Sequence, residues 1–383
     1  MLRAITFIVA TTEARRVSIR NDQPRLDSTG AIMDAHDCSI RVLPNGTYVM
    51  HAIEYGLCVA PTGQGCDQTP DHCGFRDTHN VTVWTSQDLT SGSWVRAGDA
   101  FPLATRPAGL IFRPDAIFNP NTNLWVLYYN QATPGNVYIS STSPSPFGPF
   151  TGFAQTNVTG GGTEQWTGGD FHLFTDGAQG YIVWTGMSHV AGLDHKIRIS
   201  KLTPDFLGVT DDEPYMFNDN APTTTFNEAP SVFERGGVWY ALFGHCCCYC
   251  EQGSGLFVHT APTPMGPWTA AGAGATPYDI ACEAPAPLTA LGVGGVPTPG
   301  QGCLYGGSKD VSVTRSQQDF LATYDDGNGG KSYVYYGSRW GQAPDGLKGH
   351  EPQYVFPLDF NADGSIQHIY WNDTVSFDVA VVA

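Results

Sequence analysis

DAIFNPNTNLWVLYYN, residues 115–130, joins a short apolar strand to an aromatic-rich strand through a turn of Asn and Pro. A turn of this composition between two such runs predicts a β-hairpin. The same arrangement recurs in residues 39–52, 170–186, 231–244 and 319–338. The chain is therefore built from five similar units, and this repeat decides the fold before any motif does.

A third apolar strand follows each of the first four hairpins, within residues 81–94, 137–150, 197–206 and 256–268. Units of three or four strands without helical periodicity are typical of β-propeller blades. We therefore predict an all-β protein with one five-bladed β-propeller, and a multi-stranded β-sandwich is the alternative. The closing strand, residues 374–382, is expected to complete the ring by pairing with an earlier blade.

The propeller is expected to occupy residues 31–383 as a single domain. Residues 1–30 are interpreted as an N-terminal extension that includes a weak or truncated signal, because only a short apolar stretch follows Arg3. No run of about 18 apolar residues occurs, so the sequence predicts no membrane-spanning helix.

Composition narrows the range of functions. The 383 residues include 19 Lys and Arg against 36 Asp and Glu, a formal charge of −17, which disfavours nucleic acid and anionic membranes as partners. The 45 Gly and 27 Pro break helices and suit short strands joined by turns. The 41% hydrophobic content supports a sizeable core, and we expect a monomer.

Ten cysteines and four Asn-x-Ser/Thr sequons favour a secreted protein. The sequons lie at Asn45, Asn80, Asn157 and Asn372. The cysteines form two even groups, which predicts local disulfides: Cys38, Cys58, Cys66 and Cys73, then Cys246, Cys247, Cys248, Cys250, Cys282 and Cys303. A zinc cluster around residues 245–250 is the alternative. A bridge from Cys38 would help to fix its neighbour Asp37.

Three acidic residues occupy comparable places in three units. Asp37 precedes the first hairpin, Asp115 opens the second, and Glu228 precedes the fourth. Because the innermost strands of a propeller line its central channel, we expect these side chains to converge. Inverting hydrolysis of a glycoside needs a carboxylate base and a carboxylic acid, and a third carboxylate keeps the acid protonated by repulsion.

These phrases together resemble glycoside hydrolase family 43. His36-Asp37-Cys-Ser-Ile is similar to the phrase of the family's general base, Arg113-Pro-Asp115 to that of its pKa modulator, and Glu228-Ala-Pro to that of its general acid. The resemblance runs from about residue 34 to the end. It implies a glycosidase that inverts configuration, with Asp37 as base, Asp115 as modulator and Glu228 as acid.

Within the family, the chain most resembles the exo-β-1,3-galactanase group. The similar phrases include His36, Glu54, Glu228-Ala-Pro, Ser316-Gln317 and Ser338-Arg339-Trp340. Some of those galactanases have no Asp at the base position and use a Gln at the Ser-Gln phrase, whereas this chain has both Asp37 and Gln317. Their second-blade Glu corresponds to Phe112 here. The resemblance implies galactan as first substrate, then arabinofuranosides or xylosides.

The remaining candidates would bind substrate hydroxyls or stack on a sugar face. They are His36, Glu54, Arg113, Asp170, His245, Gln317, Arg339 and Trp340, with Trp340 as the predicted sugar platform. Each also has a structural interpretation: Arg113 would brace a neighbouring blade, and Glu54 and Asp170 would serve the scaffold.

Two rival functions stay open at this point. One is a sugar-binding propeller without catalysis, and the other is a retaining enzyme of the sucrose- and fructan-acting group, whose Arg-Asp-Pro phrase is absent. No metal-binding residues are assigned and no cofactor is expected to be required. A structural calcium ion remains open.

Overall fold

The computed structural model describes residues 12–60, 78–132, 135–156, 158, 166–188, 195–210, 215–216, 227–245, 253–270, 278–281 and 314–382. These residues form β-strands and two single-turn 3₁₀ segments, Leu103–Thr105 and Lys348–His350. None of the described segments is a helix of the length and hydropathy needed to cross a membrane.

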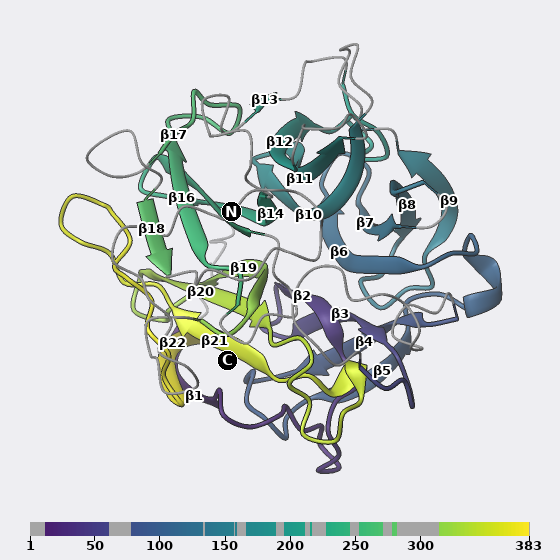
Figure 1. Cartoon of the computed structure of the whole chain (residues 1–383), viewed down its shortest axis with the longest axis horizontal. Helices are drawn as coiled ribbons and strands as arrows, with labels where there is room; N and C mark the ends of the chain where they lie inside the picture. The colour runs from purple at the N-terminus through teal and green to yellow at the C-terminus, as the bar shows by residue number, and fades with distance from the viewer. Residues whose placement is uncertain are drawn as a thin grey trace, which may run out of the picture.

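Five antiparallel sheets surround a common centre (Figure 1). The first contains β2 (His36–Val42), β3 (Tyr48–Glu54), β4 (Asn80–Ser86) and β5 (Val95–Asp99). The second contains β6 (Ile111–Asn119), β7 (Leu124–Gln131), β8 (Val137–Ser143) and β9 (Thr151–Thr156). The third contains β10 (Trp166–Asp176), β11 (Gln179–Ser188), β12 (Lys196–Lys201) and β13 (Tyr215–Met216).

The fourth sheet contains β14 (Asn227–Arg235), β15 (Val238–His245), β16 (Leu256–Ala261), β17 (Thr269–Ala270) and β18 (Tyr278–Ala281). The fifth contains β19 (Gln317–Asp325), β20 (Lys331–Ser338) and β21 (Gln353–Pro357). The first strands of the sheets, β2, β6, β10, β14 and β19, contact one another in that order, and β19 contacts β2 again. The ring is closed, so the predicted five-bladed propeller is confirmed.

The hydrophobic core lies between the blades. Each of five buried clusters joins two neighbouring blades, as Val49 on β3 and Leu127 on β7 show for the first and second. The strands therefore carry apolar side chains on both faces, because each blade packs against a blade on either side. This packing fixes the five inner strands around the channel, where the candidate residues stand.

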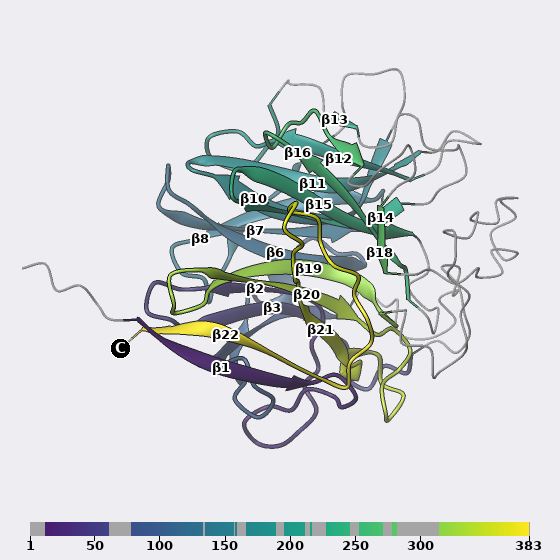
Figure 2. The ribbon, with the colours of Figure 1, turned by 90° about the vertical axis from the view of Figure 1, so that its left-hand side faces the viewer.

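A two-stranded sheet links the two ends of the described chain. Strand β1 (Thr12–Arg20) pairs antiparallel with β22 (Thr374–Val382), from Thr12 opposite Val382 to Arg20 opposite Thr374. Figure 2 shows this pair on the outside of the fifth blade. The closing segment therefore does not pair with a blade strand as predicted. Its partner is β1, within the segment interpreted as an N-terminal extension.

Every inner strand contains a β-bulge near its start. Between His36 and Ser39, β2 has one residue more than its partner strand β3, and the inner strands have the same single extra residue at Phe112/Asp115, Gly168/Phe171, Glu228/Ser231 and Gln318/Phe320. Three bulge residues have positive φ: Asp37 at 53°, Arg113 at 50° and Ala229 at 54°. Such bulges redirect side chains. In β6, for example, Arg113 at the bulge contacts Asp170, whereas Asp115 after the bulge contacts Arg41 and Leu173.

Candidate active site

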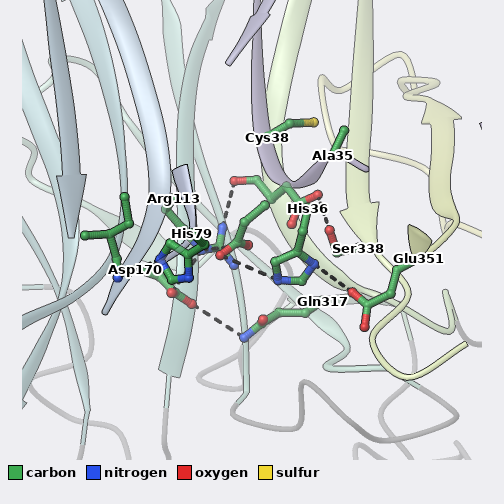
Figure 3. Close-up of polar contacts among 12 residues, drawn as sticks. Ala35, His36, Cys38, His79, Arg113, Asp170, Gln317, Ser338 and Glu351 are labelled. Carbon is green, nitrogen blue, oxygen red and sulfur yellow. Dashed lines mark hydrogen bonds and ion pairs between the residues drawn. The ribbon is translucent and has the colours of Figure 1, made fainter. Parts of the chain in front are cut away.

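One polar side chain from each blade converges at the starts of the inner strands. They are Asp37 from β2, Arg113 from β6, Asp170 from β10, Glu228 from β14 and Gln317 from β19. Figure 3 shows Arg113, Asp170 and Gln317 side by side in this cluster. We call these five residues the channel cluster.

Arg113 is the central cation of the channel cluster. Its Nε lies 2.9 Å from Asp170 Oδ1 and 3.7 Å from Asp37 Oδ1. Its Nη1 and Nη2 donate to the main-chain carbonyls of Asp319 and Gln318, at 2.9 and 2.7 Å. Burial by itself would lower the pKa of Arg113, but the surrounding carboxyls raise it above its ordinary value. The guanidinium is therefore fixed and positively charged between the carboxyl groups of Asp37 and Asp170.

Asp170 and Glu228 are the two partly exposed carboxyl groups of the site. Gln317 Nε2 donates to Glu228 Oε2 at 3.2 Å and approaches Asp170 Oδ2 at 3.5 Å. The side chains are 22% and 15% exposed, which leaves both within reach of a ligand. Burial raises the pKa of Asp170 to about 7; Arg113 opposes this rise, and the charges of Glu228 and Asp37 add to it. The two carboxyls thus stand close enough to repel each other.

Glu228 has a second partner, His195, which the sequence gave no reason to select. His195 Nδ1 lies 2.9 Å from Glu228 Oε1. The residue stands directly before β12 and belongs to no recognisable motif. Only its position next to the third strand of a blade could have drawn attention to it. Glu228 is thus held by an amide on one oxygen and an imidazole on the other.

Asp37 lies behind Arg113 with a side chain only 1% exposed. Its Oδ2 is 3.9 Å from His36 Nε2, and His36 Nδ1 is 2.7 Å from Glu351 Oε2, a contact drawn in Figure 3. The His36 ring also packs edge-on against Trp340, with ring centroids 4.4 Å apart. His36 therefore belongs to a buried support beneath Asp37 rather than to a surface that meets a sugar.

These observations can be compared with known proteins. The sequence profile of glycosyl hydrolases family 43 matches residues 72–275, more than half of the chain. The chain belongs to glycosyl hydrolases family 43. Members of this family are glycosidases, so the predicted family and enzyme class are confirmed. No curated protein sequence matches the chain.

Solved structures of exo-β-1,3-galactanases share the fold of this family 43 chain. The enzyme from Clostridium thermocellum is 18% identical with a TM-score of 0.69, over 96% of this chain and 68% of that one. A Phanerochaete chrysosporium enzyme with β-1,3-galactotriose is 20% identical, with a TM-score of 0.64 over 96% and 71%. A putative Bifidobacterium bifidum enzyme is 18% identical, with a TM-score of 0.63 over 92% and 97%.

Asp115, predicted to be the modulator of this family 43 site, is not in the channel cluster. Its Oδ1 accepts from Arg41 Nη2 at 2.6 Å, and its Oδ2 accepts from the main-chain N–H of Leu173 at 2.7 Å. The bulge at residues 113–114 brings Arg113 into the channel cluster, whereas Asp115, after the bulge, contacts Arg41 and Leu173 of the two neighbouring blades. Asp115 therefore braces three blades, and the third carboxyl of the site is Asp170.

Three predicted binding residues serve the scaffold. Glu54 is paired at 2.7 Å with Arg96 on the surface of the first blade. Arg339 donates to the carbonyl of Asn21 and to Gln342 Oε1, and its guanidinium lies over Trp371. The prediction of a platform at Trp340 is wrong, because its ring is buried between His36 and Lys348 Nζ, 3.8 Å from the ring centre.

The remaining predictions concern His245 and the cysteines. His245 ends β15 opposite Asn227, the first residue of β14. The predicted bridge at Cys38 is wrong: its thiol is free, buried, and accepts from Gln353 Nε2 at 2.8 Å. Cys58 is disulfide-bonded. The other eight cysteines, and with them the predicted second group and its zinc alternative, lie outside the described residues.

Asp319 is a second functional candidate that the sequence did not single out. It is buried at the bulge of β19, where Ser338 Oγ donates to its Oδ2 at 2.7 Å. The available signal was its position, because Asp319 opens the fifth unit as Asp115 and Asp170 open theirs.

Proposed function

We propose that this family 43 glycosidase inverts configuration and removes terminal sugars from β-1,3-linked galactan. The observation that carries the mechanism is the convergence of two partly exposed carboxyls, Asp170 and Glu228, on one amide beside Arg113 and Asp37. The substrate class follows the exo-β-1,3-galactanases that share the fold. Arabinofuranosides and xylosides come second.

In the proposed reaction, Glu228 donates a proton to the glycosidic oxygen as its bond to the anomeric carbon breaks. A water molecule attacks that carbon from the opposite face, and Asp37 accepts its proton. Asp170 is the third carboxylate: burial raises its pKa to about 7, the charges of Glu228 and Asp37 add to this rise, and its own negative charge would oppose ionisation of the neighbouring Glu228. Gln317 orients both carboxyls through its amide.

The test measures monosaccharide release from β-1,3-galactan, arabinan, xylan and aryl galactosides. We expect galactose from β-1,3-galactan, and proton NMR of the first product should show the inverted anomer. A retained anomer would instead indicate the nucleophilic mechanism of the sucrose- and fructan-acting group. Internal chain cuts in long galactan would contradict exo action. Absence of release with sugar binding intact would favour a non-catalytic binding propeller.

Substitutions separate the acid from the base. Glu228→Gln is expected to lose about 10²–10⁴-fold in kcat on galactan but to keep activity on aryl galactosides whose leaving group needs no proton. Asp37→Asn should lose activity on both substrates, because each still needs an activated water molecule. Equal losses for Glu228→Gln on the two substrates would remove Glu228 from the acid role.

We also propose that the protein is secreted, acts as a monomer and needs no metal for the reaction, because carboxyl groups carry both proton transfers. Asn45 is exposed at the β2–β3 turn and Asn372 is exposed before β22, whereas the Asn80 side chain donates to the carbonyl of Phe101. Mass spectrometry of protein secreted by a eukaryotic host should find glycans at Asn45 and Asn372 and none at Asn80.

Activity should survive a chelator, and a fall in melting temperature with chelator would reveal a structural calcium ion.

A further inference from the structure

Asp319 and Asp37 line the same buried void. The void measures about 10 Å³, roughly the size of one water molecule, and His172 and Arg113 also line it. Ser338 Oγ and Gln353 Nε2 donate to Asp319 Oδ2 at 2.7 and 3.1 Å. Neither Asp319 Oδ1 nor Asp37 Oδ1 has a hydrogen-bond partner among the described residues. The carboxyl groups of Asp319 and Asp37 therefore share one buried space, which Asp115 also lines.

Arg113 lines this space and Arg25 lies near Asp319, and neither donates a hydrogen bond to the carboxyl group of Asp319. Arg113 donates to the main-chain carbonyl of Asp319, while its Nε is directed to Asp170 and Asp37. Arg25 donates to the carbonyl of Ala35 and to two sulfur atoms. The carboxyl of Asp319 thus receives hydrogen bonds from neutral groups, whereas Asp37 faces a guanidinium.

The other titratable groups around Asp319 bring no compensating positive charge. Burial lowers the pKa of His172 on β10 to about 4, raises that of Cys38 on β2 to about 11, and raises that of Tyr335 on β20 above its ordinary range. All three are neutral at neutral pH. Asp115 on β6 is already paired with Arg41. Two ionised carboxylates in this void would repel each other across a low dielectric.

We propose that Asp319 keeps its proton across the working pH range and positions Asp37, because the single negative charge of the buried pair then stays on the carboxyl that faces Arg113. The functional part rests on the proposed role of Asp37 as base. Asp319 touches no substrate in this proposal; it fixes the charge and orientation of the residue that does. Burial, reinforced by the charge of Asp37, raises the pKa of Asp319 to about 8, in agreement with the geometry.

Infrared spectroscopy tests the proton without reference to activity. At pH 6 the native protein should show the carbonyl band of a buried protonated carboxyl, which Asp319→Asn lacks and which disappears from the native spectrum as the pH rises through about 8. Asp115→Asn is the matched control, because that carboxyl is paired with a cation and should contribute no such band. An identical band in Asp319→Asn would overturn the proposal. If Asp319→Asn does not fold, the titration is made in Asp170→Asn, which lacks the other carboxyl with a raised pKa, so the band that remains and disappears near pH 8 belongs to Asp319.

Thermal unfolding gives a second readout with a defined sign. A carboxyl whose pKa is higher in the folded than in the unfolded state stabilises the fold below its unfolded pKa, and this contribution is lost as the pH rises through the folded value. The native protein should therefore lose stability between about pH 4 and 8 through Asp319. Asp319→Asn should gain in melting temperature relative to native as the pH rises. A relative loss at high pH would mean that Asp319 is ionised and stabilising.

The pH profile of hydrolysis tests the positioning of Asp37. If Asp319 is neutral, Asp319→Asn preserves the charge, so the acid limb of kcat/KM should stay at the native pH. A shift of that limb to lower pH would show that a negative charge had been removed, and it would overturn the positioning role. If no substrate is hydrolysed, the proposed function fails, while the infrared and thermal results still decide whether Asp319 holds a proton.

Discussion

Asp115 and Asp170 are identical side chains that the fold uses in opposite ways. Asp115 has Arg41 on one oxygen and a main-chain N–H on the other, so its charge is neutralised inside the scaffold. Asp170 shares its guanidinium with Asp37 and stands near Glu228, so burial and repulsion raise its pKa to about 7. A raised pKa in a partly exposed carboxyl beside another acid is typical of catalytic sites.

Asp170→Asn tests the modulator role. Removing the repulsion should make the remaining acid lose its proton more readily, so the alkaline limb of the kcat profile moves to lower pH. Activity at pH 7 is expected to drop by on the order of tenfold. The measurement is kcat on galactan across pH, with melting temperature recorded alongside. An alkaline limb at the native pH would exclude Asp170 as modulator.

Asp115→Asn is the matched substitution on the neighbouring strand and has the opposite expected outcome. It leaves the partly buried Arg41 without its carboxylate, which should cost about 1.5–3 kcal/mol of the free energy of unfolding. The pH limbs of activity should not move. Denaturant unfolding and the same pH profile measure both effects. Movement of the alkaline limb would restore Asp115 to the modulator role that its sequence phrase suggested.

At the scale of the element, the bulge at the start of each inner strand decides which residues reach the site. Hairpins at 39–52, 115–130, 170–186, 231–244 and 319–338 could be predicted from alternation and turn composition, because these are local properties of the sequence. The bulge could not, since no residue type marks it. Arg113-Pro-Asp115 therefore looked like a site phrase for Asp115, whereas the extra residue brings Arg113 to the site.

The same reasoning explains which site residues were accessible to sequence analysis. Asp37, Glu228 and Gln317 lie in phrases that resemble a family, so they could be named in advance. His195 reaches Glu228 only because two neighbouring blades pack together. Trp340 is buried, with Lys348 Nζ over its ring, and not exposed as predicted. Contacts between blades are long-range, and a single sequence does not contain them.

Ala229→Val tests the bulge of β14. Ala229 has a φ of 54° and its carbonyl accepts from Gln318 Nε2 at 2.7 Å, so its backbone is fixed where a β-branched side chain is strained. We expect a loss of about 1–3 kcal/mol in the free energy of unfolding. Activity should also drop, because Glu228 precedes the strained residue. Ala229→Gly is the control and should be at least as stable as native; equal stability of Val and Gly would refute the strain.

At the scale of the whole molecule, the ring is held by a contact between the two ends of the described chain. Five interblade cores make each blade depend on its neighbours, and the cluster between the first and fifth blades also contains Val17 from β1 and Phe377 from β22. Phe377 stacks on Tyr324 of β19 with an interplanar angle of 9°. The β1–β22 pair thus packs against the interface between the first and fifth blades, where the propeller closes; we call this pair the clasp and this interface the seam.

Phe377→Ala should open this seam. Removing a buried aromatic ring costs about 3–5 kcal/mol in the free energy of unfolding, because the cavity cannot collapse fully. The site lies at the starts of the inner strands and the clasp on the outer side of the fifth blade, so kcat below the melting temperature should stay native (Figure 2). Asp378→Ala, next to Phe377 and joined to Arg16 by a surface ion pair at 3.3 Å, should cost less than about 1 kcal/mol. A Phe377→Ala variant as stable as Asp378→Ala would mean that the interblade cores close the propeller without the clasp.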